Sequence, residues 1–196
     1  MKKLPIFRMR IKESDTDKLQ VEAIALVDEP AILVQWQAFA NHVKFSVDKE
    51  RQLLMAPVML ADFPIFRRDK ERGEHYVLFD KEEIYKIAQK FFRKGFASNF
   101  NLMHDEGRKI DGVYILETFL IDESRGIRPP KDFADVSQGS WFITVKVDNT
   151  EVWENFVKTG EMKGFSVEGM FDYEYAEDVS QTEVDEIVSI VENIGK

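Results

Sequence analysis

Apolar and polar side chains alternate in several short stretches of the first half of the chain, which predicts strands there. Residues 4–11 alternate apolar and basic side chains, as a half-buried strand does. The stretches 21–27 and 53–59 are more continuously apolar, and Pro57 in the second indicates a bulge or an edge strand. Residues 76–79 predict one further short strand.

Helical periodicity appears at three places, each opened by a capping residue. A capping-box pattern at Asp80 begins a helix with apolar residues on one face, and Gly95 ends it. A shorter helix is predicted over 148–160, with Asp148 as its cap. A third helix is predicted over 180–195, because its apolar residues form one stripe that would pack on the body of the protein.

Strands return in the second half of the chain. Residues 113–121, 141–147 and 165–175 have strand patterns, and 122–139 is a polar segment that predicts a long loop. Strands and helices do not alternate regularly. The pattern therefore favours the α+β class, as a bent antiparallel sheet or β-barrel flanked by about three helices, and residues 1–196 as one domain.

Composition narrows the classes of function. The chain has no cysteine, which excludes disulfides, thiolate nucleophiles and cysteine-ligated metals, and favours a protein made and used in a cytoplasm. The formal net charge of −9 disfavours nucleic-acid binding. No apolar run approaches the ~20 residues of a membrane helix, and the first residues do not have the pattern of a signal peptide.

Residues 158–169 place a serine near the start of a strand. A short helix ends at glycine, the chain turns, and Ser166 falls on the more polar face of the strand together with Glu168. This geometry suits a nucleophile that must meet a peptide. The segment is not a nucleophile elbow, because Glu168 replaces the second glycine of that motif. The alternative is that Ser166 is simply a small residue that opens a strand.

A serine nucleophile needs a base, and His104 is the best candidate of the three histidines. It follows the predicted helix, within residues 101–105, at the mouth of a predicted sheet. The alternative is a histidine in a surface turn. His42 and His75 lie in polar stretches and are expected to be solvated. We expect no metal site, because His104 and the two acidic residues after it are consecutive and cannot converge.

These residues carry a resemblance to a known family. Residues 101–105, 139–141, 158–161 and 164–169 resemble, in this order, segments of the prohead maturation serine proteases of tailed bacteriophages. The resemblance covers roughly residues 95–175. Those proteases are similar in fold to the herpesvirus assembly protease, so the resemblance implies a β-barrel-like α+β fold.

The same resemblance implies a function. His104 and Ser166 would form the catalytic pair of a serine endopeptidase that cleaves scaffolding protein or major capsid protein, and also its own chain. The expected place is the host bacterial cytoplasm, inside the assembling procapsid. No cofactor, metal, nucleic acid or membrane is implied. A homo-oligomer is an expectation because herpesvirus relatives work as dimers. The loop 122–139 either helps to form the substrate cleft or is a mobile surface segment.

The third member of a catalytic triad is less clear from the sequence. Residues 21–31 are similar to a strand ending in Pro-Ala that carries the acidic member in related phage proteases, which makes Glu22 the best candidate. Its spacing to the proline differs by one residue, and one residue reverses the face of a strand. Asp105 and Glu168 are alternatives, as is an enzyme that works as a dyad.

Two other functions compete with proteolysis. The first is a catalytically inactive structural or scaffolding component of the procapsid with the same fold. The second is a small-molecule esterase, which the incomplete nucleophile elbow and the lack of βαβ alternation disfavour.

Overall fold

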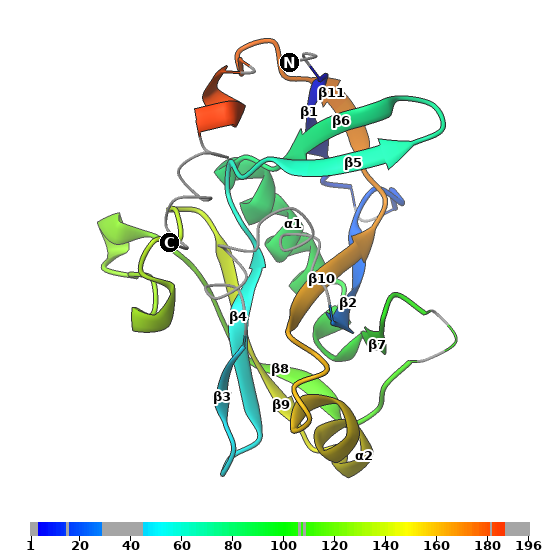
Figure 1. The fold of residues 1–196 in the computed structure, drawn as a ribbon, viewed down its shortest axis with the longest axis vertical. Coiled ribbons are helices and arrows are strands. Elements are labelled where there is room, and N and C mark those ends of the chain that lie inside the picture. The colour runs from blue at the N-terminus through cyan, green and yellow to red at the C-terminus, as the bar shows by residue number, and fades with distance from the viewer. Residues whose placement is uncertain are drawn as a thin grey trace.

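The fold is built from three sheets and three short helices, and it confirms the α+β class. The computed structural model describes residues 4–14, 16–28, 45–105, 107, 109–180 and 182–186. One sheet lies apart from the other two, which share the lower half of the molecule in Figure 1. Within the described residues, no helix has the length and apolar character needed to cross a membrane.

The first sheet has four strands in the order β11-β1-β6-β5. Its members are β1 (Ile6–Arg10), β5 (Ile65–Asp69), β6 (Gly73–Leu78) and β11 (Asp172–Tyr175). Strand β1 pairs antiparallel with β11 and parallel with β6. The sheet therefore joins the start of the described chain to a strand near its end.

The second sheet has three strands in the order β10-β2-β7. They are β2 (Val21–Val27), β7 (Phe100–Leu102) and β10 (Gly164–Gly169). The central strand β2 pairs antiparallel with β10 and parallel with β7. Figure 1 shows the three side by side.

The third sheet is antiparallel throughout, in the order β3-β4-β9-β8. Its strands are β3 (Ser46–Asp48), β4 (Leu53–Met59), β8 (Val113–Leu120) and β9 (Trp141–Val147). The register shifts after Pro57, which confirms the predicted bulge. Strand β4 pairs with β9 along its length but with β3 only at Leu53–Met55, so among the described strands Pro57 has a partner on one side alone.

Within the part of the chain that the structure describes, the strands form three separate sheets. The closed barrel, which was one of the predicted architectures, is not present there. The predicted strand 165–175 is divided into β10 and β11, which belong to different sheets. Gly169 explains the division, because a Cβ there would lie 2.2 Å from the carbonyl oxygen of Gln20. Backbones approach closely at this bulge, and the chain then leaves β2.

The first helix, α1 (Lys81–Arg93), begins at the predicted cap. Asp80 Oδ1 accepts a hydrogen bond of 2.8 Å from the Glu83 N–H. The buried Glu83 carboxylate does not return to the cap, and instead accepts from the Ile11 N–H at 2.6 Å. Only one half of the predicted capping box is therefore present. The predicted apolar face is buried, and consists of Ile84, Ile87, Ala88 and Phe91.

The second helix begins one residue later than predicted. Helix α2 (Thr150–Val152) continues into a π-helical turn (Trp153–Val157). Asn149 is its cap, because the Asn149 side chain accepts a hydrogen bond of 3.0 Å from the Val152 N–H. The prediction of Asp148 as the cap is wrong, since both residue types can cap and the neighbouring strand β9 fixes which one does.

The third helix begins with the predicted capping box. Ser180 Oγ accepts from the Glu183 N–H at 3.2 Å, and the Glu183 carboxylate accepts from the Ser180 N–H at 2.6 Å. Residues 182–186 are helical, and the rest of the predicted helix lies outside the described residues. Short 3₁₀ turns occupy Phe96–Ser98, Glu123–Arg125 and Lys131–Phe133.

The long loop 122–139 is packed on the body of the protein. Phe133 and Val136 are buried, and the Phe133 ring meets Phe142 edge-on at 5.3 Å between ring centroids. Ser137 Oγ donates a hydrogen bond of 2.9 Å to a backbone carbonyl oxygen. The loop is thus anchored by two buried apolar side chains and the hydrogen bond of the Ser137 hydroxyl.

His75 is a buried residue, which corrects the expectation that it is solvated. Its side chain is fully enclosed in β6, edge-on to the rings of Phe7 and Tyr173. The Nδ1 atom lies 3.0 Å from the Gly73 carbonyl oxygen. No local pattern indicates this burial, because the aromatic rings that cover His75 come from β1 and β11. His42 lies outside the described residues.

Lys90 fastens α1 to the segment that precedes β2. Its side chain is almost completely buried, and its ammonium donates to the backbone carbonyls of Lys12, Asp17 and Leu19 at 2.7, 3.1 and 3.2 Å. A buried ammonium is tolerated only when such acceptors replace water. The lysine therefore holds the entry to β2, the central strand of the second sheet.

We predict that Lys90→Met lowers the free energy of unfolding by about 3 kcal/mol, because three backbone carbonyls lose a charged donor. Urea denaturation measures the change. The control is Lys86→Met in the same helix. The Lys86 ammonium is partly exposed and lies at the long distances of 3.7 Å from Glu13 and 3.9 Å from Glu83, so its loss should cost less than about 1 kcal/mol. Equal losses in both variants would contradict the role given to Lys90.

Candidate active site

Ser166 lies in the middle of β10, in register with residues of the two neighbouring strands. It is opposite Ala25 of β2, and Ala25 is opposite Asn101 of β7. Directly opposed residues of a sheet place their side chains on the same face. Ser166, Ala25 and Asn101 therefore form one row across the sheet.

The face that carries Ser166 is turned away from the main core. Side chains of the adjacent positions point to the other face and are buried in the main apolar cluster, namely Ile24, Leu26, Phe100, Leu102 and Phe165. Ser166 itself is 8% exposed. Its hydroxyl makes no side-chain hydrogen bond within the described residues, so it is not committed to a structural role.

His104 occupies a turn that directly follows β7. Both Met103 and His104 have φ of 57°, in the left-handed region that few residues other than glycine adopt. Two hydrogen bonds hold the turn, from the Met103 N–H to the Leu26 carbonyl and from the Asp105 N–H to the Leu102 carbonyl, both of 3.0 Å. The histidine is exposed. Strained backbone of this kind is common at functional sites.

The structure places Ser166 on the outer strand β10 and His104 in the turn that follows the other outer strand, β7, with β2 between the two strands. Neighbouring strands are ~4.8 Å apart, so β10 and β7 are separated by about 10 Å. The side chain between the two strands in the Ser166 row is the methyl group of Ala25, which is fully buried. Within the described residues, the two side chains share no hydrogen bond.

The candidate acids lie in different positions. Glu22 is two residues before Ile24 on β2, so its side chain is on the same face as Ile24 and on the opposite face from Ser166. Its carboxylate accepts a hydrogen bond of 2.9 Å from Gln20 Nε2. Asp105 accepts from the Gly107 N–H at 2.9 Å. The structure thus brings neither carboxylate to the Ser166 face.

Glu168 is the carboxylate that shares a face with Ser166, two residues along β10. It accepts a hydrogen bond from Asn101 Nδ2, which connects β10 to β7 across β2. Asn101 is a residue of this site that the sequence pattern did not indicate. The signal was weak, because only the strand register reveals that a residue three positions before His104 stands in the Ser166 row.

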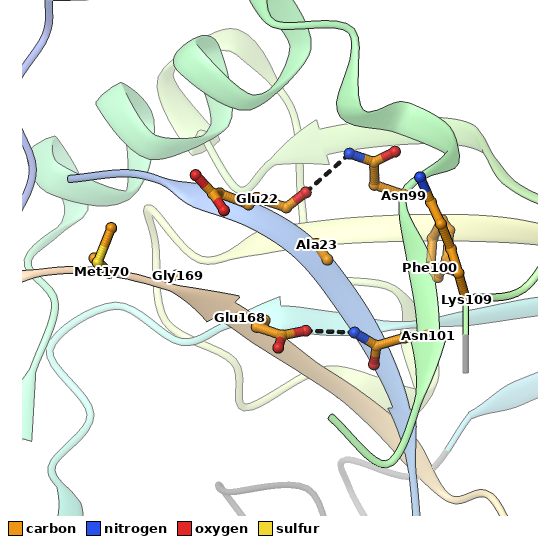
Figure 2. Close-up of a pocket in the computed structure, with 9 residues that line it drawn as sticks. All are labelled: Glu22, Ala23, Asn99, Phe100, Asn101, Lys109, Glu168, Gly169 and Met170. Carbon is orange, nitrogen blue, oxygen red and sulfur yellow. Dashed lines mark hydrogen bonds between the residues drawn. The ribbon is translucent and has the colours of Figure 1, made fainter. Parts of the chain in front are cut away.

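A pocket of about 500 Å³ adjoins this row (Figure 2). It lies over the ends of β10 and β2 beside β7. Its lining residues are Glu22, Ala23, Asn99, Phe100, Asn101, Lys109, Glu168, Gly169 and Met170. The close approach of Gly169 to Gln20 shapes this end of the pocket, since any larger residue would push the two strands apart.

The chemistry available here is that of the Ser166 hydroxyl on the sheet and the His104 imidazole in the turn after β7. A serine hydroxyl with a nearby base can attack a carbonyl carbon and form an acyl intermediate. Among the described residues, no group of three histidine or carboxylate side chains is arranged to hold a metal ion.

The comparison with known families finds one matching family model. The model of a family described as "Putative phage serine protease XkdF" matches residues 46–174, more than half of the chain. The matched segment includes both His104 and Ser166, and it begins after β2. No curated protein and no solved structure matches the chain.

Proposed function

Because the chain belongs to the family described as "Putative phage serine protease XkdF", we propose that it is a serine endopeptidase with Ser166 as nucleophile and His104 as general base. The observation that carries the proposal is that Ser166 and the turn of His104 belong to the two outer strands, β10 and β7, of one sheet. Ser166 has an uncommitted hydroxyl on the face away from the core, and His104 follows the outer strand β7 of the same sheet.

The proposed reaction is acyl transfer in two stages. His104 removes the proton of the Ser166 hydroxyl as the oxygen attacks a peptide carbonyl, and returns that proton to the departing amine. A water molecule then hydrolyses the ester with the same histidine as base. Binding of the substrate would bring the His104 ring and the Ser166 hydroxyl together, since catalytic hydrogen bonds often tighten only in the complex.

We propose that the pair works as a dyad. Glu22 faces the far side of β2 and is held by Gln20, while Asp105 is held by the Gly107 N–H. Glu168 is on the correct face, but its carboxylate is joined to Asn101. These contacts support the dyad over a triad completed by Glu22.

The proposed substrates are the scaffolding protein or the major capsid protein of the phage, and the chain itself. The proposed place of action is the assembling procapsid in the host cytoplasm. We also propose that the fold of the chain is related to that of the herpesvirus assembly protease. Two features support this part of the proposal. The family description assigns the relatives to phages and to serine proteolysis, and the resemblance around His104 and Ser166 is to procapsid maturation proteases.

Co-expression in bacteria tests the proposal. The chain is produced together with the capsid and scaffolding proteins of its phage, and intact masses are measured after assembly. We expect shortened capsid, scaffold or protease chains with defined new termini. Full-length chains in assembled procapsids, at every time point, would instead support an inactive structural component.

A further inference from the structure

The pocket beside Ser166 has an excess of hydrogen-bond acceptors at one end. Glu168 contributes two carboxylate oxygens, of which one accepts from Asn101 Nδ2. Asn101 Oδ1 is buried and has no hydrogen-bond partner within the described residues, although Asn101 is only 5% exposed. The amide orientation is fixed, because the atom that meets the carboxylate must be the donor.

A buried acceptor without a partner is unfavourable unless a ligand supplies the donor. Here Asn101 lines the pocket next to the Glu168 carboxylate, so the ligand that suits both acceptors is a cation with several N–H groups. An anion would meet Glu168 directly and be repelled. An uncharged apolar group would leave Asn101 Oδ1 unsatisfied.

Lys109 is the cationic side chain among the residues that line the pocket. The backbone of Lys109 pairs with that of Asn101, and in the view of Figure 2 its side chain extends toward Asn99 and away from Glu168. No ion pair joins Lys109 to Glu168 within the described residues. The acidic end of the pocket is therefore open to a cation from outside the chain.

The distance from the nucleophile suits a substrate side chain. Glu168 is two residues from Ser166 on the same face of β10, which corresponds to ~7 Å. Consecutive side chains of an extended peptide on one face have the same spacing. A peptide whose scissile carbonyl meets Ser166 can thus direct a neighbouring side chain toward Glu168.

The walls of the pocket suit an aliphatic stem. Ala23 lies opposite Glu168 in the register and presents only a methyl group. Met170, half exposed, adds apolar surface at the rim. Lysine and arginine combine an aliphatic stem with a charged head that has several donors.

We infer that this pocket is a specificity subsite that binds a lysine or arginine side chain of the peptide substrate, with Glu168 and Asn101 Oδ1 as the acceptors for its charge. The inference rests on the proposed proteolytic function of Ser166 and adds the class of residue that flanks the scissile bond. Charged hydrogen bonds of this kind discriminate strongly, because the wrong side chain leaves buried acceptors unpaired.

Cleavage-site mapping and a matched peptide pair test the subsite. Mass spectrometry of the products should place lysine or arginine at one fixed position beside the scissile bond. A peptide with such a site is then compared with its norleucine analogue, which keeps the stem and removes the charge. We expect kcat/KM to fall by about 30-fold for norleucine, and Glu168→Gln to reduce this ratio to less than about 3.

The control is Glu161→Gln, an exposed carboxylate outside the pocket, which should keep the full ratio. Ala23→Arg is the second variant, because it places a guanidinium opposite Glu168 and should also remove the preference for lysine. Sites without a fixed basic residue, or equal cleavage of both peptides by the wild type, would overturn the subsite and leave the protease proposal intact. If the wild-type protein shows no cleavage that depends on Ser166, both the subsite and the protease proposal are wrong.

Discussion

Ser166→Ala is expected to abolish proteolysis and labelling by a fluorophosphonate probe, with a loss of rate on the order of 10⁴-fold or more. The probe reacts only with an activated serine oxygen, and alanine lacks that oxygen. The fold should persist, because the Ser166 hydroxyl makes no side-chain hydrogen bond within the described residues. We therefore expect the same Tm as the wild type, measured by differential scanning calorimetry.

Ser140→Ala is the matched control for this variant. Ser140 is fully buried, and its Oγ accepts a hydrogen bond of 3.0 Å from the Ala61 N–H. Its removal should cost about 1–2 kcal/mol of stability and leave labelling unchanged. If Ser166→Ala is labelled as fast as the wild type, another residue is the nucleophile and the proposed mechanism is wrong.

His104→Ala is expected to slow both proteolysis and labelling by about 10³-fold or more, because the serine loses its base. The ring is exposed and belongs to a turn, so the Tm should change little. Single-turnover labelling at a fixed probe concentration measures the rate.

His75→Ala separates a catalytic histidine from a structural one. Removal of the enclosed ring from between Phe7 and Tyr173 creates a cavity and should lower stability by about 2–4 kcal/mol. Labelling at a temperature where the variant is folded should match the wild type. Equal labelling rates in His104→Ala and wild type would exclude His104 as the base.

Local signals in the sequence predicted most elements but not their arrangement. The cap at Asp80, the apolar face of α1 and the capping box at Ser180 depend on neighbouring residues, and all three are present. Parallel pairing of β1 with β6 and of β2 with β7 depends on segments far apart along the chain. No local pattern encodes such pairing, so a bent antiparallel sheet or barrel was the nearest expectation.

The candidate site likewise has residues that local sequence signals indicate and residues that only strand pairing brings together. Ser166 and His104 could be selected from motif and context, because Ser166 stands near the start of a predicted strand and His104 follows a predicted helix. Asn101 could not, since its place beside Glu168 results from two successive strand registers. The burial of His75 had the same cause, with aromatic cover supplied by two distant strands.

The most direct test of the account is a crystal structure of the protein after reaction with a fluorophosphonate. We expect the phosphorus atom on Ser166 Oγ, and the His104 ring within about 3 Å of an oxygen of the adduct. An adduct on a different side chain, or a His104 ring on the core-facing side of the β10-β2-β7 sheet, would contradict the assignment.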